Sequence, residues 1–369
     1  MPTLYFLPWC RLRCRYIVGE IELSPVRSVA APQGPNPSFA PSVVQGLQHF
    51  VDLDDAAVHE VTAVRLKGGE WVGELTPESE QALRECLAVA CFAALACRDF
   101  EQDAGQWSNA DCFQLYAYEL PSDPVRTETL RVSRRDGIVK VLAGYPAKYH
   151  RPVHTASADS IAIDVQLAQA LAAFRDRAIG AGKQATWEQM LDAILVFNRA
   201  NSDARYADPR DDWVMMSSAF QRLLGRPTKA LDDATGTAQE FRGIIEEPAN
   251  EVGADLNLIE EWLREFCRIR GAFAHGRRLP GQPQRWDYRS HLLSAAISFP
   301  LLVRFLLEKE GLYSRTITDR AALAALPEFL QQRTQNTART EWWQLCLHKK
   351  LEVAIALGLK ERAETSTGG

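Results

Sequence analysis

An arginine and a histidine in the C-terminal half of the chain could act together on a phosphate group. The stretch EEWLREFCRIRGAFAHGRRLPGQPQRWDYRSH, from Glu260 to His291, contains Arg270 and, five residues later, His275. A guanidinium group binds phosphate oxygens through paired N–H donors, and an imidazole exchanges a proton near neutral pH. The two side chains are therefore candidates for phosphate binding and for acid–base catalysis.

The same stretch is the most basic part of an acidic chain. The whole protein has a formal net charge of −5, whereas the span from Arg264 to Arg289 holds seven arginines, no lysine and a net charge of +5. Because forked guanidinium groups suit bidentate phosphate contacts, the implied ligand is a polyanion. Arg268, Arg277 and Arg278 are the candidates for substrate contact. A solvated face or ion pairs between subunits are the alternatives for these three residues.

The helix that carries Arg270 is expected to end close to His275. Gly276 is typical of a left-handed C-cap, which places His275 in the last turn or at the cap. Five residues rotate about 500° on a regular helix, so the two side chains stand roughly 140° apart. They converge only if the last turn unwinds or if two chains each contribute one residue.

The sequence RGAFAHG, from Arg270 to Gly276, resembles the Arg-x4-6-His motif of HEPN domains, helical bundles that include many metal-independent ribonucleases of defence systems. Ile269 before the arginine, the helix leading into it and the closing Ala-His-Gly are similar to the family pattern. The resemblance covers about Ala185 to Gly311 and is greatest to the ApeA-like branch, whose members often carry a separate N-terminal domain.

This resemblance implies an endoribonuclease that needs no metal and no cofactor. His275 would activate the RNA 2′-hydroxyl or protonate the leaving oxygen, and Arg270 would hold the scissile phosphate. The family's motif pairs across a two-fold axis, so the resemblance also implies a homodimer with a composite active site. By the same analogy the protein would be a toxin or antiviral defence effector, whose RNA target and phage or cellular trigger the sequence does not give.

One position departs from the family pattern and keeps a second function open. The family frequently has a polar residue, commonly Asn, directly after the motif arginine, and this chain has Gly271. The alternative is a non-catalytic HEPN-like module that binds RNA or nucleotide and dimerises. An enzyme seated in the N-terminal domain has no recognisable nucleophile with its base, and no phosphate loop, to support it.

The remaining sequence predicts an α+β N-terminal domain, residues 1–158, followed by an all-helical domain, residues 159–369, with the HEPN-like core at about 185–311. Asp136-Gly137 lies between two strand-like runs and predicts a hairpin. Further strands are expected at Arg15–Leu23, His59–Leu66 and Cys112–Tyr118, a helix at Pro77–Cys97 with Thr76 as its cap, and an irregular loop at Ser24–Ser42.

Helical periodicity dominates after Asp159. A capping box is expected at Thr186–Gln189 and a second at Asn257–Glu260, with a helix starting near Asp255 or Asn257. Three stretches each have an apolar face and are expected to be helices. A fourth helix is expected at Tyr288–Glu310, with a kink at Pro300. Asn198, Arg199, Asn201 and Asp203 either end a helix or face the site, while Trp342, Trp343 and Phe329 suggest a final packed helix.

Composition favours a globular protein of the cytoplasm. The chain has 369 residues, 46% of them hydrophobic, and its eight cysteines include no Cys-x-x-Cys, which argues against structural zinc. No signal peptide is expected, because the first basic residues follow the first apolar stretch. The longest apolar run, Cys86–Cys97, is too short to cross a membrane. His150 and His154 are expected to lie in a linker and not to bind a metal. Asp52, Asp54 and Asp55 are expected to form a solvated turn and not a metal site.

Overall fold

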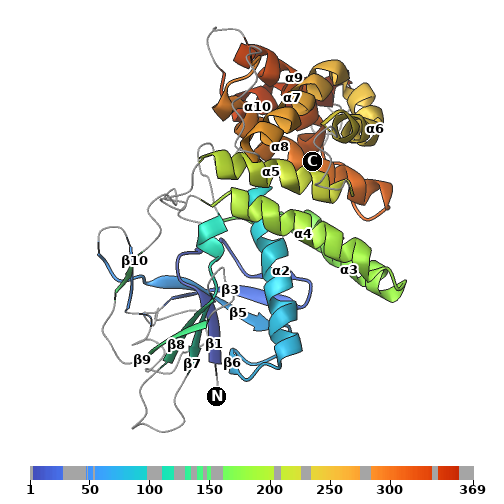
Figure 1. Ribbon diagram of the computed structural model, residues 1–369. Helices are drawn as coiled ribbons and strands as arrows, with labels where there is room; N and C mark the ends of the chain where they lie inside the picture. The colour runs from blue at the N-terminus through green and yellow to red at the C-terminus, as the bar shows by residue number, and fades with distance from the viewer. Residues whose placement is uncertain are drawn as a thin grey trace, which may run out of the picture. The chain divides into compact units, whose positions relative to one another are not determined.

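The computed structural model describes residues 3–27, 47, 49–52, 55–97, 110–119, 129–133, 139–143, 148–150, 161–202, 209–225, 234–274, 284–334 and 340–356. The chain divides into two compact units (Figure 1). The first contains the described residues up to Ala172 together with Asn201 and Ser202, and the second contains Ala173–Ala200 and the described residues from 209 onward.

The division lies inside helix α3 (Val165–Gly180), later than the sequence boundary at residue 158. Backbone hydrogen bonds explain the difference, because they attach the residues before α3 to the first unit. Ile161 exchanges bonds with the backbone of Arg11 and Arg13, and the N–H of Asp164 donates to Ala93 at 3.1 Å. The change to helical periodicity therefore precedes the change of unit.

The first unit is built on an antiparallel sheet with the strand order β2-β3-β5-β1-β7-β8-β9, in which β6 also pairs with β1. Its strands are β1 (Thr3–Leu7), β2 (Tyr16–Val18), β3 (Ile21–Arg27), β5 (Glu60–Leu66), β6 (Val72–Gly73), β7 (Tyr116–Glu119), β8 (Thr129–Ser133) and β9 (Val139–Ala143). β4 (Phe50–Val51) and β10 (Tyr149–His150) form a separate parallel pair. Helix α2 (Pro77–Leu95) packs against β2, β3 and β5.

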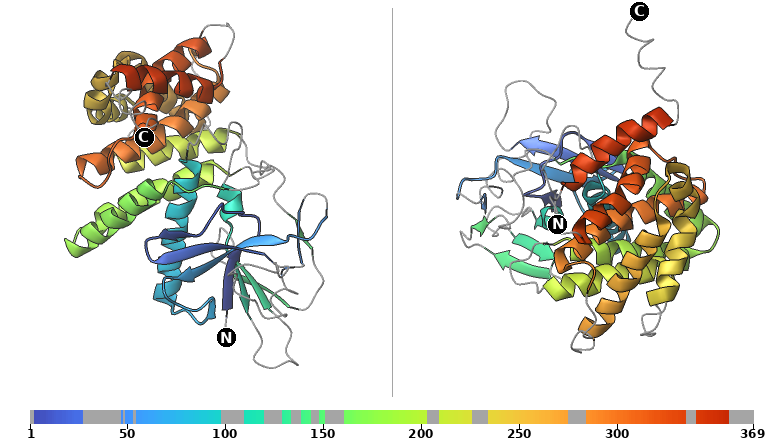
Figure 2. Two further views of the ribbon diagram at one scale, coloured as in Figure 1. Left: turned by 180° about the vertical axis from the view of Figure 1, so that it is seen from behind. Right: turned by 90° about the horizontal axis from the view of Figure 1, so that it is seen from above.

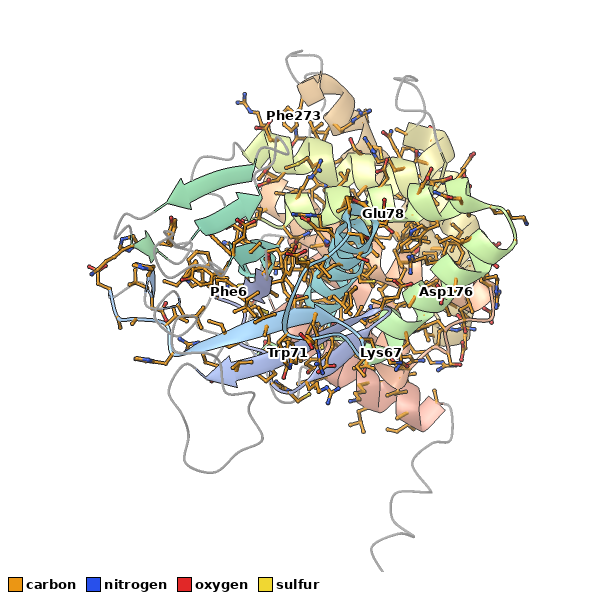
Figure 3. The ribbon with its side chains drawn as sticks, turned by 90° about the horizontal axis from the view of Figure 1, so that it is seen from below. Phe6, Lys67, Trp71, Glu78, Asp176 and Phe273 are labelled. Carbon is orange, nitrogen blue, oxygen red and sulfur yellow. The ribbon has the colours of Figure 1, made fainter. Side chains whose placement is uncertain are left out.

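Every residue of β1 is buried, so both faces of the central strand are covered. Phe6 packs edge-on against Phe50, with ring centroids 5.2 Å apart, and Tyr149 stacks on Phe50 at the same distance. Trp9 and Tyr116 complete this aromatic cluster. Figure 3 labels Phe6 among the side chains of the sheet. The apolar run at the start of the chain is thus a core strand.

Three expectations for this unit are confirmed and three are corrected. The expected strand at Cys112–Tyr118 is a short 3-10 helix at Ala110–Phe113 followed by β7. β8 pairs antiparallel with β9, which confirms the expected hairpin, although its turn lies outside the described residues. β5 occupies the expected strand, and Thr76 caps α2 by accepting from the N–H of Ser79. The stretch Arg15–Leu23 is two strands, not one. Residues 24–27 belong to β3, not to a loop, and Pro25 is tolerated because β2 pairs with β3 only at Ile21–Leu23.

The second unit is a bundle of helices. After the second half of α3 come α4 (Gln184–Ala200), α5 (Pro209–Leu223), α6 (Ala234–Val252), α7 (Leu256–Ala274), α8 (Tyr288–Lys309), α9 (Ile317–Thr334) and α10 (Trp342–Ala356). Both views of Figure 2 show α9 and α10 side by side. Phe220 on α5 lies at the centre, with its ring edge-on to Phe241 of α6 and Phe299 of α8.

The expected apolar faces are buried, whereas both expected capping boxes are wrong. Trp187, Ile194 and Phe197 of α4 and Trp213 of α5 lie in the core. Thr186 is not a cap, because α4 already begins at Gln184. α7 is capped by the carboxylate of Asp255, which accepts from the N–H groups of residues 257 and 258, so the second capping box is also wrong.

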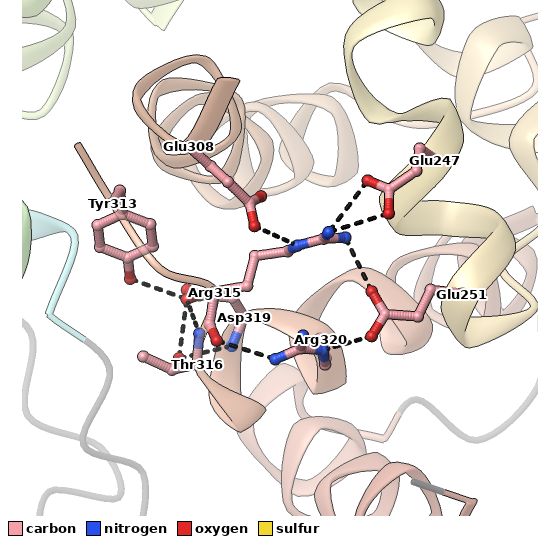
Figure 4. A network of polar contacts seen from close by, with 8 residues as sticks. All are labelled: Glu247, Glu251, Glu308, Tyr313, Arg315, Thr316, Asp319 and Arg320. Carbon is pink, nitrogen blue, oxygen red and sulfur yellow. Dashed lines mark hydrogen bonds and ion pairs between the residues drawn. The ribbon is translucent and has the colours of Figure 1, made fainter. Parts of the chain in front are cut away.

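Salt bridges join α6, α8 and α9 at one side of this bundle (Figure 4). Arg315 binds Glu247 and Glu251 of α6 and Glu308 of α8. Asp319 of α9 accepts hydrogen bonds from Tyr313 and Thr316. The contacts fix the segment between α8 and α9.

Among the described residues, α8 alone is long and apolar enough to cross a membrane, although the longest unbroken apolar run of the sequence lies elsewhere, at Cys86–Cys97. Its most apolar window is 78% buried inside the bundle. Packing against neighbouring helices accounts for its hydropathy, as for a core helix. α8 also matches the fourth expected helix, and it continues through Pro300.

Candidate functional site

Arg270 projects from the C-terminal part of α7 and is half-buried. Its Nε is buried, and no described residue hydrogen-bonds to it. Burial lowers the pKa of its guanidinium group, which still remains charged. A partly desolvated arginine with an unsatisfied donor is suited to an anionic ligand, because the ligand would replace the lost hydration.

The expected partner of Arg270 falls outside the described residues. α7 ends at Ala274, one residue before His275. Arg277 and Arg278 also lie outside the described residues, so their predicted roles stay predictions. Within the described residues, Arg270 lies on the helix that was expected to carry it.

Arg268 and Arg270 do not share one face of α7. Residues two positions apart in a helix are separated by about 200° around the helix axis. Arg268 is exposed, whereas Arg270 is half-buried between its neighbours. The structure therefore does not bring these two predicted ligand-binding side chains together within one chain.

Ion pairs offset part of the positive charge around the motif. Arg264 is bound to Glu260, one turn earlier on α7, and Arg285 is bound to Glu261. Both glutamates precede the span from which the net charge of +5 was counted. The local electrostatic potential is consequently less positive than that count implies. Arg270 is therefore a better candidate for anion binding than Arg264 or Arg285, which are already paired.

A buried pair that the sequence pattern did not reveal lies next to this part of α7. The carboxylate of Glu265 lies 3.0 Å from Nε2 of His291 on α8. His291 is 0% exposed, and its Nδ1 has no hydrogen-bond partner among the described residues. Burial lowers the pKa of His291 although the bond to Glu265 opposes this effect. The imidazole is therefore neutral at pH 7, with Nε2 as its donor.

Aromatic rings enclose His291. Ring centroids of Trp213, Phe266 and Trp286 lie 4.7, 5.8 and 6.0 Å from the imidazole. Trp213 also contacts Phe273, which is labelled in Figure 3, with centroids 5.5 Å apart. The sealed environment means that His291 does not contact a substrate directly.

The other candidate residues have structural roles where the structure describes them. His150 pairs with Asp55 at 3.5 Å, and Asp52 pairs with Arg11 at 3.1 Å. In the described part of the chain no group of three or more His, Cys, Asp or Glu side chains could hold a metal ion. Cys86 and Cys91 are buried on α2, as expected for small core residues.

Polar residues at the end of α4 and the last aromatic residues can also be placed. Asn198 is buried, and the carbonyl of Asn201 accepts from the N–H of Ala110. Trp342 packs edge-on against Phe329, with centroids 5.4 Å apart, which confirms the expected final helix.

No protein-family model matches this chain, and no curated protein or solved structure is significantly similar to it. The candidate site therefore stands on the residues and contacts of this chain alone.

Proposed function

We propose that the second unit is a HEPN-type helical bundle and that the protein is a metal-independent endoribonuclease. The observation that carries this proposal is Arg270, whose buried Nε has no partner among the described residues, in the last turns of α7 and five residues before His275. An RNA phosphate supplies the acceptor that this donor lacks.

The chemistry requires one proton transfer at each side of the phosphate. His275 as general base removes the proton of the RNA 2′-hydroxyl, and the 2′-oxygen attacks the adjacent phosphorus. The bond to the 5′-oxygen of the next nucleotide breaks, and this oxygen is protonated by an imidazolium. The products are a 2′,3′-cyclic phosphate and a free 5′-hydroxyl. Arg270 stabilises the negative charge that develops on the phosphoryl oxygens.

A homodimer resolves the angular separation of the two motif residues. On one regular helix Arg270 and His275 diverge by roughly 140°. A two-fold axis beside the end of α7 would bring two arginines and two histidines to one composite site, as the resemblance to HEPN domains implies. The two histidines then serve as base and acid in the same reaction.

The first unit, in this proposal, senses or holds a trigger, and the second unit cuts RNA in the cytoplasm as a growth-arresting defence effector or toxin. Defence rests on family analogy.

The test incubates wild-type and His275→Ala protein with a mixed RNA pool in EDTA and maps the product ends. Cleavage by the wild type alone, with cyclic-phosphate or 3′-phosphate ends, is the expected result. Equal cleavage by both proteins would contradict the proposal. Arg222→Ala is the control, because Arg222 is an exposed arginine of α5 that pairs with Asp192.

Gly271 favours a second candidate, a non-catalytic module that binds RNA and dimerises. This protein would retain RNA without shortening it. Its binding would weaken as salt rises, and Arg270→Ala would reduce both the affinity and the slope against salt concentration. Filter binding at several salt concentrations, alongside the cleavage assay, separates the two functions.

A further inference from the structure

Two partly exposed aromatic rings lie beside the part of α7 that carries Arg270. Phe273 belongs to α7, and Tyr288 is the first residue of α8. Both rings pack against the buried indole of Trp213, with centroids 5.5 and 5.2 Å from it. Two different helices therefore bring aromatic surface to one place, and part of each ring is accessible to solvent.

The indole beneath these rings is itself fixed by the core. Trp213 is 1% exposed, and its ring stacks on Phe266 of α7 with centroids 5.2 Å apart. Aromatic side chains that rest on a buried ring have few conformations to lose when a ligand binds. Phe273 and Tyr288 are therefore suited to offer a flat ligand a rigid surface.

An exposed arginine stands over one of the two rings. The guanidinium carbon of Arg210, the second residue of α5, lies 5.9 Å from the ring centroid of Phe273. The corresponding distance from Arg65 to Trp71 in the first unit is 4.1 Å. The contact of Arg210 is near the outer limit for a cation–π pair. A planar guanidinium held this loosely can move to stack on a nucleobase.

The rings lie at a useful spacing from the proposed phosphate contact. Phe273 follows Arg270 by three positions, so the two side chains stand about 60° apart around the axis of α7. Their Cβ atoms are neighbours at about 5–6 Å. In a nucleotide one sugar joins the base to the phosphate. A phosphate at Arg270 therefore places a base of the same strand within reach of Phe273.

Acidic neighbours limit what this surface can contribute. Asp211 is exposed next to Arg210, and Asp287 precedes Tyr288 and caps α8 by accepting from the N–H of Ser290. These carboxylates leave little net positive charge around the rings. Binding here must come from stacking, which releases no counterions, whereas a phosphate contact does.

We propose that Phe273 and Tyr288, with Arg210, form a stacking subsite for a nucleobase of single-stranded RNA, next to the phosphate that Arg270 holds. The inference rests on the proposed function and adds the class of substrate. An unpaired strand is required, because only unstacked bases present their faces to aromatic side chains. Every base has such a face, so the subsite selects unpaired RNA without selecting a sequence.

The test measures binding of two fluorescent 2′-O-methyl RNA single strands of equal length to the full-length protein. One strand carries bases and the other is abasic. Neither can be cleaved through a 2′-hydroxyl. Phe273→Leu keeps an apolar side chain but removes the aromatic face. It is expected to weaken the strand with bases by about 5- to 10-fold, the lower end for base–aromatic stacking, and to leave the abasic strand within about 2-fold.

Trp71→Leu is the matched control, because Trp71 is a partly buried ring beside an arginine in the first unit. Its affinities for both strands are expected to stay within about 2-fold of wild type. Circular dichroism checks that each variant is folded. If Phe273→Leu does not fold, Tyr288→Leu provides the same comparison.

A salt titration separates stacking from charge. The slope of log affinity against log salt concentration is expected to be equal in Phe273→Leu and wild type, and shallower in Arg270→Ala, which loses a phosphate contact. A Phe273 variant with the wild-type affinity for the strand with bases would overturn the subsite. An equal loss on both strands would also overturn it, since Phe273 would then only support packing.

The subsite and the proposed ribonuclease can fail separately. A wild-type protein that binds the strand with bases more tightly than the abasic strand, but cuts no unmodified RNA, would reject the nuclease and keep the subsite. A wild-type protein that cuts RNA but binds both strands equally would keep the nuclease and reject the subsite.

Discussion

The indole N–H of Trp213 donates to the backbone carbonyl of Phe266 at 3.0 Å. Phe266 precedes Arg270 by four positions, and in a helix its carbonyl is also the acceptor for the N–H of Arg270. Trp213 belongs to α5 and is buried. The bond thus connects a second helix directly to the turn of α7 that carries Arg270.

Trp213→Phe is expected to destabilise the second unit by about 1–3 kcal/mol, since it removes a buried indole and leaves space behind. Urea unfolding followed by circular dichroism measures the change. Trp71→Phe is the control, because Trp71 is only partly buried and lies in the first unit, beneath Arg65. A Trp213 variant as stable as this control would contradict the assigned role.

The pH dependence of stability is expected to report the His291–Glu265 pair. Burial holds the pKa of His291 below its ordinary value of 6.5. His291 therefore binds a proton more readily in the unfolded chain than in the folded chain, and stability is lost as the pH falls below about 6.5. Glu265 adds a loss at lower pH: burial raises its pKa, but the bonds from His291, Arg285 and Trp286 outweigh this effect and lower it.

His291→Gln removes the loss of stability that protonation of His291 causes below about pH 6.5. The difference between its urea midpoints at pH 7.5 and pH 5.5 is expected to be smaller than the wild-type difference. An equal difference in both proteins would show that other groups cause the loss. His150→Gln is the control, because His150 is exposed.

Asp319 and Glu247 are expected to differ strongly in their effect on stability, although both belong to the network in Figure 4. Asp319 is buried, accepts bonds from Tyr313 and Thr316 and lies 3.3 Å from Nε of the buried Arg304. Asp319→Ala removes the carboxylate that faces this buried guanidinium, so a loss of about 3–5 kcal/mol is expected.

Glu247→Ala changes an exposed ion pair, for which a loss below about 1 kcal/mol is expected. Thermal unfolding of the two variants side by side checks the ranking. A Glu247 variant that is the less stable of the two would contradict it.

The sequence predicted the parts of the fold that depend on local periodicity. The spacing of Trp187, Ile194 and Phe197 identified the buried face of α4, and the Asp-Gly dipeptide identified the β8–β9 hairpin. Caps were less predictable, because Thr186 has the right chemistry but lies inside the helix. α6 and α9 each contain a proline, Pro248 and Pro327, a residue that local rules associate with helix ends.

The candidate site was predictable only in its local part. Arg270 was found from the motif and from the helix that leads into it. Glu265 and His291 were not, since they lie 26 residues apart and come together only in the folded chain. The ion pairs of Glu260 and Glu261 were also missed, because a charge count along the chain does not show which side chains meet.

Arg270→Lys is expected to separate a forked phosphate contact from a simple positive charge. Lysine keeps the charge but loses the planar pair of donors, so kcat/KM for RNA is expected to fall by about 100-fold. Arg222→Lys makes the same substitution on exposed α5, where one bond to Asp192 is replaced, and is expected to retain activity within about 2-fold. Initial rates on a defined RNA oligonucleotide at a fixed salt concentration measure both. If Arg270→Lys cuts as fast as the wild type, Arg270 contributes only charge, and the bidentate role assigned to its guanidinium is wrong.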